Sequence, residues 1–221
     1  MREPHPPRPN SRYPDYDVLE KRDTPSWNEK TREVIARRLA IGSERPEFFN
    51  ADEFLTVDAI AARIVPQPDG RPPIPVAGLV DEKLHIERAD GFRRAGMPRE
   101  GEAWRITLHA LDVEAEAAYG KPFRSLDDAA QDAMLRRMEK DELKSEAWQG
   151  LPCADLFKNR IGRDIVYAYY AHPSAWSEIG WGGPASPRGY VRMDFNERDP
   201  WEAIEVKGDF ATAPRKERRD G

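Results

Sequence analysis

The feature that most constrains this chain is the recurrence of apolar residues at helical spacing, in stretches that end at proline or glycine. The clearest stretch begins with Asn50 and Glu53, a pair whose side chains satisfy free amides at the start of a helix. Apolar residues follow at intervals of three and four until Pro66 stops the pattern. Such patterns predict helices over about 27–40, 50–65, 76–89, 101–119, 126–141 and 152–171. We therefore predict an all-α fold, a single helical domain of about six helices.

The two ends of the chain lack this spacing. Residues 1–25 are rich in proline, which has no amide hydrogen and keeps the preceding residue out of a helix, so we predict an extended N-terminal arm. Residues 194–221 are predicted to form a second extended arm, which leaves 26–193 for the helical domain. Hydrophobic residues make up 39 % and charged residues 34 % of the chain, against about 45–50 % and about 25 % in ordinary globular proteins. This composition favours one compact core with other segments laid on a partner or disordered.

The charge balance and the apolar content exclude two kinds of partner. The chain has 35 basic and 40 acidic residues, a net charge of -5, whereas nucleic-acid binders carry a clustered basic excess. The one basic run, residues 215–219, is short and is interrupted by Glu217, so we interpret it as a solvated terminus. No run of about 18 apolar residues occurs, so we predict no membrane span.

Two residue groups could carry chemistry. Glu82 and His85 have the Glu-x-x-His spacing that binds metal in helical-bundle di-iron proteins, although no other histidine of the chain follows a glutamate in this way. A free-standing helical metal-binding enzyme centred on this pair is therefore an alternative interpretation. The single cysteine, Cys153, lies at a predicted helix start, which favours a thiolate, but nothing local supplies a base, so a core role is expected. The sequence contains neither a Gly-x-Ser-x-Gly elbow nor a glycine-rich nucleotide loop, and it predicts no catalytic and no cofactor-binding residue.

The segment 172–193 differs from the rest because proline, glycine and aromatic residues dominate it. It shows no helical or strand period, and we predict an ordered loop. Trp176, Trp181 and Tyr190 lie within 15 residues there, and aromatic residues and arginine are those that most often supply interface energy. The predicted partner contacts are Trp176, Trp181, Arg188 and Tyr190, with Tyr13, Tyr16 and Trp27 from the N-terminal part. Two other interpretations stay open: the loop packs on its own helices, or it covers a small-molecule ligand.

Three stretches resemble a known family. They are the phenylalanine-led helix 48–54 with its continuation 62–66, the link 118–123, and the loop 172–184 with its two tryptophans. Together they are similar to the gluconate 2-dehydrogenase subunit 3 family, the small subunits of flavin-dependent, membrane-associated sugar and sugar-acid dehydrogenases. The resemblance covers roughly residues 45–193.

The resemblance implies a complex. In this family the large partner holds FAD and performs the oxidation, a haem-bearing c-type cytochrome subunit often takes the electrons, and the small subunit contributes no cofactor. We therefore expect a non-catalytic accessory subunit that binds and stabilises a dehydrogenase of the glucose–methanol–choline kind and acts as a chaperone in its assembly or export. Many such subunits begin with a twin-arginine export signal, whereas residues 1–30 here are polar and Pro- and Arg-rich. The expected location is cytoplasmic, or periplasmic by transport with the partner.

Overall fold

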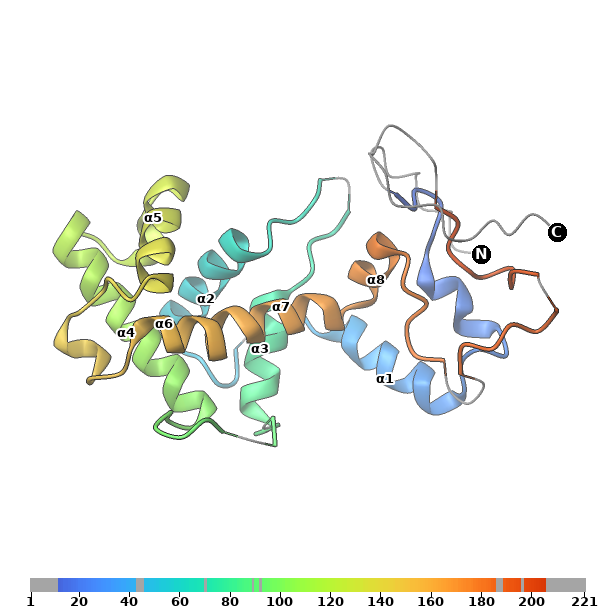
Figure 1. Ribbon diagram of the computed structural model, residues 1–221, viewed down its shortest axis with the longest axis horizontal. Coiled ribbons are helices and arrows are strands. Elements are labelled where there is room, and N and C mark those ends of the chain that lie inside the picture. Colours follow the sequence, from blue (N-terminus) through green and yellow to red (C-terminus); the bar gives the residue numbers. More distant parts are fainter. Residues whose placement is uncertain are drawn as a thin grey trace. The chain divides into compact units, whose positions relative to one another are not determined.

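The computed structural model describes residues 12–42, 46–69, 71–88, 90–91, 93–185, 189–195 and 197–205. These residues form helices and connecting turns without a β-strand (Figure 1), which confirms the predicted all-α fold. The contacts divide the chain into two compact units. We call Arg38–Ala171 the central unit and the remainder, Met1–Arg37 with His172–Gly221, the terminal unit. The bounds predicted from the sequence, near residues 25 and 193, stay a prediction; the two units by contacts divide between Arg37 and Arg38 and between Ala171 and His172.

The helices of the central unit follow one another with short connections. They are α2 (Ala51–Ile64), α3 (Val76–His85), α4 (Glu100–Tyr119), η2 (Phe123–Ser125), α5 (Asp128–Glu139), η3 (Glu146–Trp148), α6 (Cys153–Leu156), η4 (Phe157–Ile161) and α7 (Gly162–Ala171). The last three form one continuous helical run with a π-helical turn in the middle. The terminal unit contains η1 (Val18–Asp23), most of α1 (Glu29–Ala40) and α8 (Pro173–Ile179).

The start of α2 has the local geometry that its sequence predicts. The Asn50 side chain accepts a hydrogen bond from the amide of Glu53, and the Glu53 carboxylate accepts one from the amide of Asn50, both at 2.9 Å. The apolar stripe of the helix is buried, with Val57 and Ile60 fully inaccessible. The helix ends at Ile64, two residues before Pro66. Capping and periodicity together account for this element.

The core of the central unit lies around α4 and the run from α6 to α7. Trp104 and Leu111 of α4, Met138 of α5 and Ile161 and Ile165 of the run are all fully buried. Phe49 packs against Trp104 in an edge-to-face arrangement, with ring centroids 5.7 Å apart. Because these side chains come from helices that are distant in sequence, the core joins the whole length of the unit.

A buried carboxylate on α3 holds the segment that leads into α2. Asp81, 3 % exposed, accepts hydrogen bonds from the amides of Glu47, Phe48 and Phe49 at 2.7, 3.1 and 2.9 Å. Three amides on one ionised acceptor form a strong arrangement, because each bond is charge-assisted. Asp81 thereby fixes the position of Phe49 in the core and the point at which α2 begins.

Two predictions for the terminal unit are corrected. The expected extended arm contains the 3-10 helix η1, and the expected loop contains α8, which His172 caps at its start and left-handed Gly180 ends. Val18 of η1 is fully buried and donates its amide to Ser177 Oγ at 3.1 Å. The blue and orange segments of Figure 1 therefore lie side by side although they are far apart in sequence. Each helix is only six or seven residues long, too short to show a period.

The remaining parts of the predicted arms are described only in part. Residues 197–205 form turns without a helix, while residues 1–11 and 206–221 lie outside the described residues. In the part of the chain that the structure covers, no helix is both long and apolar enough to cross a membrane.

We expect Asp81→Ala to lower the free energy of unfolding by about 3 kcal/mol, because three buried amides lose a charged acceptor. Urea denaturation followed by circular dichroism measures this. Asp69→Ala, which removes an exposed carboxylate from a turn, is the matched control and should change the same quantity by less than about 0.5 kcal/mol. Equal effects of the two substitutions would show that Asp81 does not anchor the segment before α2.

Candidate functional site

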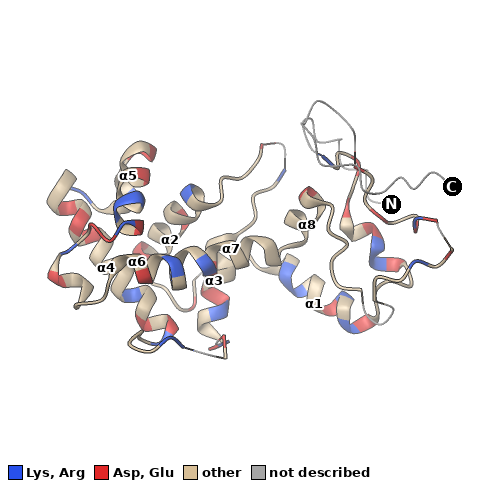
Figure 2. Cartoon of the chain, in the orientation of Figure 1, with Lys and Arg blue, Asp and Glu red and all other residues tan. Residues whose placement is uncertain are grey.

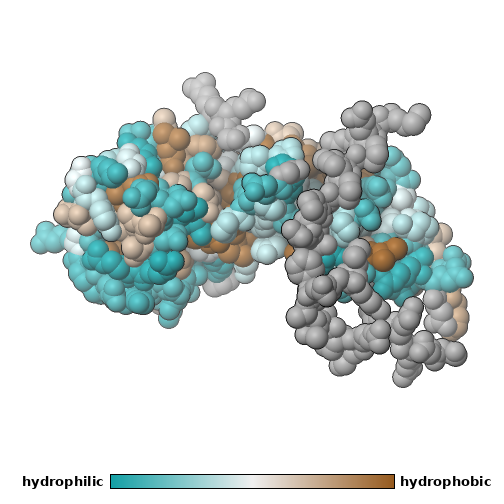
Figure 3. All heavy atoms as spheres, turned by 90° about the horizontal axis from the view of Figure 1, so that it is seen from above, coloured by the Kyte–Doolittle hydropathy of each residue, from teal (hydrophilic) through white to brown (hydrophobic). Residues whose placement is uncertain are grey.

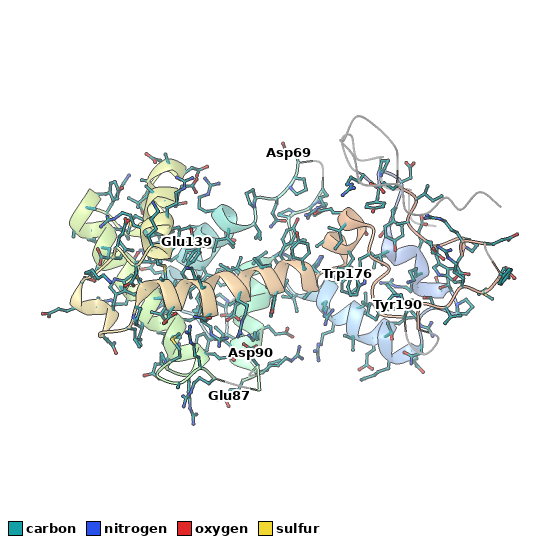
Figure 4. The ribbon with its side chains drawn as sticks, in the orientation of Figure 1. Asp69, Glu87, Asp90, Glu139, Trp176 and Tyr190 are labelled. Carbon is teal, nitrogen blue, oxygen red and sulfur yellow. The ribbon has the colours of Figure 1, made fainter. Side chains whose placement is uncertain are left out.

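The aromatic residues predicted to contact a partner all lie in the terminal unit. The rings of Trp176 and Trp181 meet edge to face, with centroids 4.9 Å apart. The Tyr16 hydroxyl donates to the carbonyl of Trp181 at 3.4 Å, and the Tyr190 hydroxyl donates to the carbonyl of Gly183 at 2.9 Å. Figure 4 marks Trp176 on α8 and Tyr190 on the segment that follows it. The structure thus brings most of the predicted residues into one neighbourhood, while Arg188 lies outside the described residues.

Burial separates these residues into two groups. Trp176 is 1 % exposed, Trp27 2 % and Tyr16 7 %, so they form the core of the terminal unit. Trp181 is 41 % and Tyr190 69 % exposed, which leaves both available to another molecule. Their contact with a partner stays a prediction, and the buried three can support it only by holding the exposed ones in place.

Glycines allow the segment after α8 to lie against the N-terminal part. Gly180 has a φ of +67°, and a Cβ atom there would lie 2.5 Å from the ring of Tyr13, a half-buried residue. Gly183 has a φ of +64°, and its Cβ would lie 2.9 Å from the ring of Trp176. Positive φ and close approach to a ring both require glycine. The Gly-rich character of this segment is therefore explained by packing within the unit.

A cavity of about 550 Å³ opens beside this segment, lined by fourteen residues that include Tyr16, Tyr190 and Trp201. Its charged side chains are already engaged within the protein. Lys21, 4 % exposed, donates to the carbonyl of Gly182, and Arg192 donates to Glu202 at 2.9 Å. Burial, together with nearby carboxylates, raises the pKa of Tyr16, so its hydroxyl stays protonated and acts as a donor. The cavity offers aromatic surface and a few polar groups.

The central unit carries basic and acidic residues along its helices (Figure 2). A cluster of them surrounds Lys83 of α3. Its ammonium lies 2.9 Å from Asp90 Oδ1, 3.3 Å from Glu100 Oε2 and 3.0 Å from Asp164 Oδ1. Burial alone would lower the pKa of Lys83, but the hydrogen bond to Asp90 and the charges of Asp164 and Glu100 outweigh it, so the pKa is raised. The ammonium stays charged throughout the neutral range.

Two arginines balance the carboxylates of the same cluster. Arg160 lies 3.0 Å from Asp90 and 3.2 Å from both Glu100 and Asp164, and Arg163 also pairs with Asp90. Burial opposes ionisation of Asp90, yet Lys83 and Arg160 lower its pKa overall. The shifts of Lys83 and Asp90 point away from neutral pH, the opposite of what a general acid or base needs. We interpret the cluster as a structural ion-pair network that joins α3, α4 and the helical run that ends in α7.

The two residue groups that suggested chemistry have different surroundings. His85 Nε2 lies 3.6 Å from Glu47 Oε2 and is half exposed. Among the described residues no group of three or more His, Cys, Asp or Glu side chains is placed to hold a metal ion. The thiol of Cys153 is buried and donates to the Met138 carbonyl at 3.4 Å, and burial raises its pKa. The thiol therefore behaves as a small core group.

Fold and site together describe a small all-α protein with a buried aromatic core in its terminal unit and aromatic side chains on the surface beside it. The family model for gluconate 2-dehydrogenase subunit 3 matches residues 51–183, which is more than half of the 221 residues. The chain therefore belongs to the gluconate 2-dehydrogenase subunit 3 family, as the resemblance of its motifs indicated. By its name this is a family of dehydrogenase subunits. No curated protein and no solved structure matches the chain.

We expect Trp176→Ala to lower the free energy of unfolding by about 3–5 kcal/mol, because it empties the centre of the terminal unit. Trp181→Ala removes the neighbouring indole, which is 41 % exposed. This substitution should lower the free energy of unfolding by about 1 kcal/mol or less. Thermal and chemical denaturation of the two variants provide the comparison. Similar losses from both would contradict the separation into a core and a surface tryptophan.

We expect Asp90→Asn to lower the free energy of unfolding at pH 7 by about 1–3 kcal/mol, because Lys83, Arg160 and Arg163 lose a charged partner. The folded-state pKa of Asp90 is lowered, so its contribution is complete above about pH 5 and disappears as the pH falls through the folded pKa. The difference between wild type and variant should shrink over that acid range. Urea denaturation at several pH values tests this, and a difference that grows on acidification would contradict the assignment.

Proposed function

We propose that this chain is a non-catalytic small subunit that binds and stabilises a large FAD-dependent dehydrogenase of the glucose–methanol–choline kind, gluconate 2-dehydrogenase-like, acting on a sugar or sugar acid. The observation that carries the proposal is the run of exposed apolar side chains that follows the buried Trp176. Trp181 is 41 %, Tyr190 69 % and Val191 72 % exposed. Membership in a family of dehydrogenase subunits supports a protein as the molecule that covers them.

We assign FAD to the large subunit and haem to a c-type cytochrome subunit of the complex. A flavin dinucleotide is held through its pyrophosphate by backbone amides at a glycine-rich turn that opens a helix. Gly180 and Gly183, two glycines of the segment beside the cavity, are instead packed against Tyr13 and Trp176. The cavity beside them has Lys21 and Arg192 bonded to Gly182 and Glu202. These contacts support the assignment of FAD to the large subunit.

The physical role of such a subunit is stabilisation by binding. A protein that binds the folded form of the flavoprotein, and not its unfolded form, raises the stability of that form in proportion to the logarithm of its own concentration. Binding during assembly would also cover apolar surface that otherwise causes aggregation. A chaperone role in assembly or export follows from the same binding energy, in the cytoplasm or in transit to the periplasm.

The cavity is the feature that a small-molecule binding protein would use. Its charged groups are paired internally, as Arg192 with Glu202 and the Asp199 carboxylate with the amide of Met193 show. A polar ligand would have to displace these bonds. The exposed aromatic and apolar side chains, by contrast, need no rearrangement to be covered by a protein, which favours the subunit.

A tagged copy expressed in its native cell should co-purify with a large chain that shows a flavin absorption spectrum, at a near-stoichiometric ratio. Mass spectrometry should identify that chain as a dehydrogenase, and removal of the small subunit should lower its melting temperature. As a control, a tagged unrelated helical protein of similar charge should retain no flavoprotein. Elution of this chain alone and colourless under gentle conditions would contradict the proposal.

A further inference from the structure

We infer that the segment after the cavity, residues 189–195 and 197–205, is the element that docks onto the large subunit; we call it the C-terminal loop. Its apolar side chains would enter a hydrophobic surface of the partner that basic side chains border. This inference rests on the proposed function and adds the surface and the chemistry of the receiving site. The loop lies after residue 183, where the family match ends, so family membership by itself assigns it no role.

The C-terminal loop exposes large apolar side chains at high density. Within six residues Tyr190 is 69 %, Val191 72 %, Met193 58 % and Phe195 92 % exposed, and Ile204 is 70 % exposed. On the face drawn in Figure 3, hydrophobic surface forms separate patches on a largely hydrophilic background. The exposed apolar residues of the central unit are spread over different helices, for example Leu55 on α2, Tyr119 on α4 and Tyr167 on α7. Clustered exposure of this kind marks an interaction surface.

Polar bonds hold the loop in shape without using those apolar side chains. Arg192 donates to both oxygens of Glu202, at 2.9 and 3.0 Å. The carboxylate of Asp199, a residue 8 % exposed, accepts from the amide of Met193 at 3.0 Å, and the Asp199 amide donates to Glu202 at 3.0 Å. Arg198 donates to the carbonyl of Ala203 at 2.9 Å. A surface that is already ordered loses less entropy on binding, so its apolar area contributes more of its burial energy to affinity.

The base of the loop is joined to the core of the terminal unit. The Tyr190 hydroxyl donates to the carbonyl of Gly183, and Gly183 lies against the buried ring of Trp176. At the other end Glu205 pairs with Arg12 at 2.8 Å. The loop is therefore anchored at both ends to structure in the same unit.

The charge of the loop decides what kind of partner covers it. Between residues 190 and 205 there are two basic residues, Arg192 and Arg198, and five acidic ones, which gives a net charge of -3. An anionic membrane surface attracts basic segments and repels one of this sign. A second copy of the chain would bring a like charge. A protein surface with an apolar centre and a basic rim fits both the side chains and the charge, with aromatic residues and methionine as the usual interface anchors.

The first test is capture of the flavoprotein by three forms of the full chain. The loop variant carries Val191→Ser, Met193→Ser and Phe195→Ser, and the control variant carries Leu55→Ser, Tyr119→Ser and Tyr167→Ser on the central unit. Circular dichroism and melting curves confirm that each is folded. We expect wild type and control to retain the flavoprotein equally, and the loop variant to bind at least tenfold more weakly.

A photo-crosslinking residue provides a second test, which does not require the complex or the fold to be weakened. Placed at Phe195, it should crosslink to the flavoprotein, and the crosslinked peptide should contain apolar residues with lysine or arginine beside them. Placed at Tyr167, it should give no such product. Crosslinking from Tyr167 and not from Phe195 would overturn the inference.

The remaining outcomes separate the loop from the proposed function. If the loop variant retains the flavoprotein to the same extent as wild type, the docking role of the loop is overturned and the subunit function is left intact. Wild type that captures no flavoprotein overturns the proposed function and, with it, this partner. Flotation of wild type, but not of the loop variant, with vesicles of phosphatidylcholine and phosphatidylglycerol would assign the loop to a membrane and overturn the protein partner.

Discussion

The central unit depends on the neutralisation of one carboxylate that is entirely removed from water. The Asp164 side chain is fully buried, and it is paired with Lys83 and Arg160 and accepts the indole hydrogen of Trp104 at 2.9 Å. A buried charge without partners would cost several kcal/mol, so Lys83, Arg160 and Trp104 together stabilise the packing of α3, α4 and α7 around this carboxylate. The loop after α3 is included because Asp90 completes the charge balance (Figure 4).

The same groups connect the charge cluster to the rest of the core. Trp104 donates to Asp164 on one side and packs against Phe49 on the other. The amide of Phe49 is in turn bound by Asp81 of α3. Two buried carboxylates thus position the aromatic contact between α4 and the segment that starts α2. A chain with 39 % hydrophobic and 34 % charged residues achieves a specific core partly through such polar contacts, which have narrower geometric requirements than apolar packing.

Prediction from the sequence succeeded where the signals are local. The capping pair, the apolar stripe and the proline stop define α2 within a few consecutive residues, and the family motifs are continuous stretches. The charge cluster was missed because Lys83 and Asp164 are 81 positions apart, and nothing near either residue indicates the other. Both η1 and α8 were missed because six or seven residues are too few for a period. Aromatic composition identified the right neighbourhood of the terminal unit, but only the fold could show that Trp176 is buried and Tyr190 exposed.

The two units use aromatic and apolar residues in different ways. In the central unit Trp104 and Leu111 of α4 and Ile165 of α7 are buried, and charge pairs complete the core. In the terminal unit Trp27, Val18 and Trp176 are buried, while Met193 and Phe195 are left on a loop that ion pairs keep ordered. Selection for solubility alone disfavours such exposure, because burying each of these apolar side chains away from water lowers the free energy. This exposure supports the proposal that a second protein covers the loop, which is the relation expected between a small subunit and its large partner.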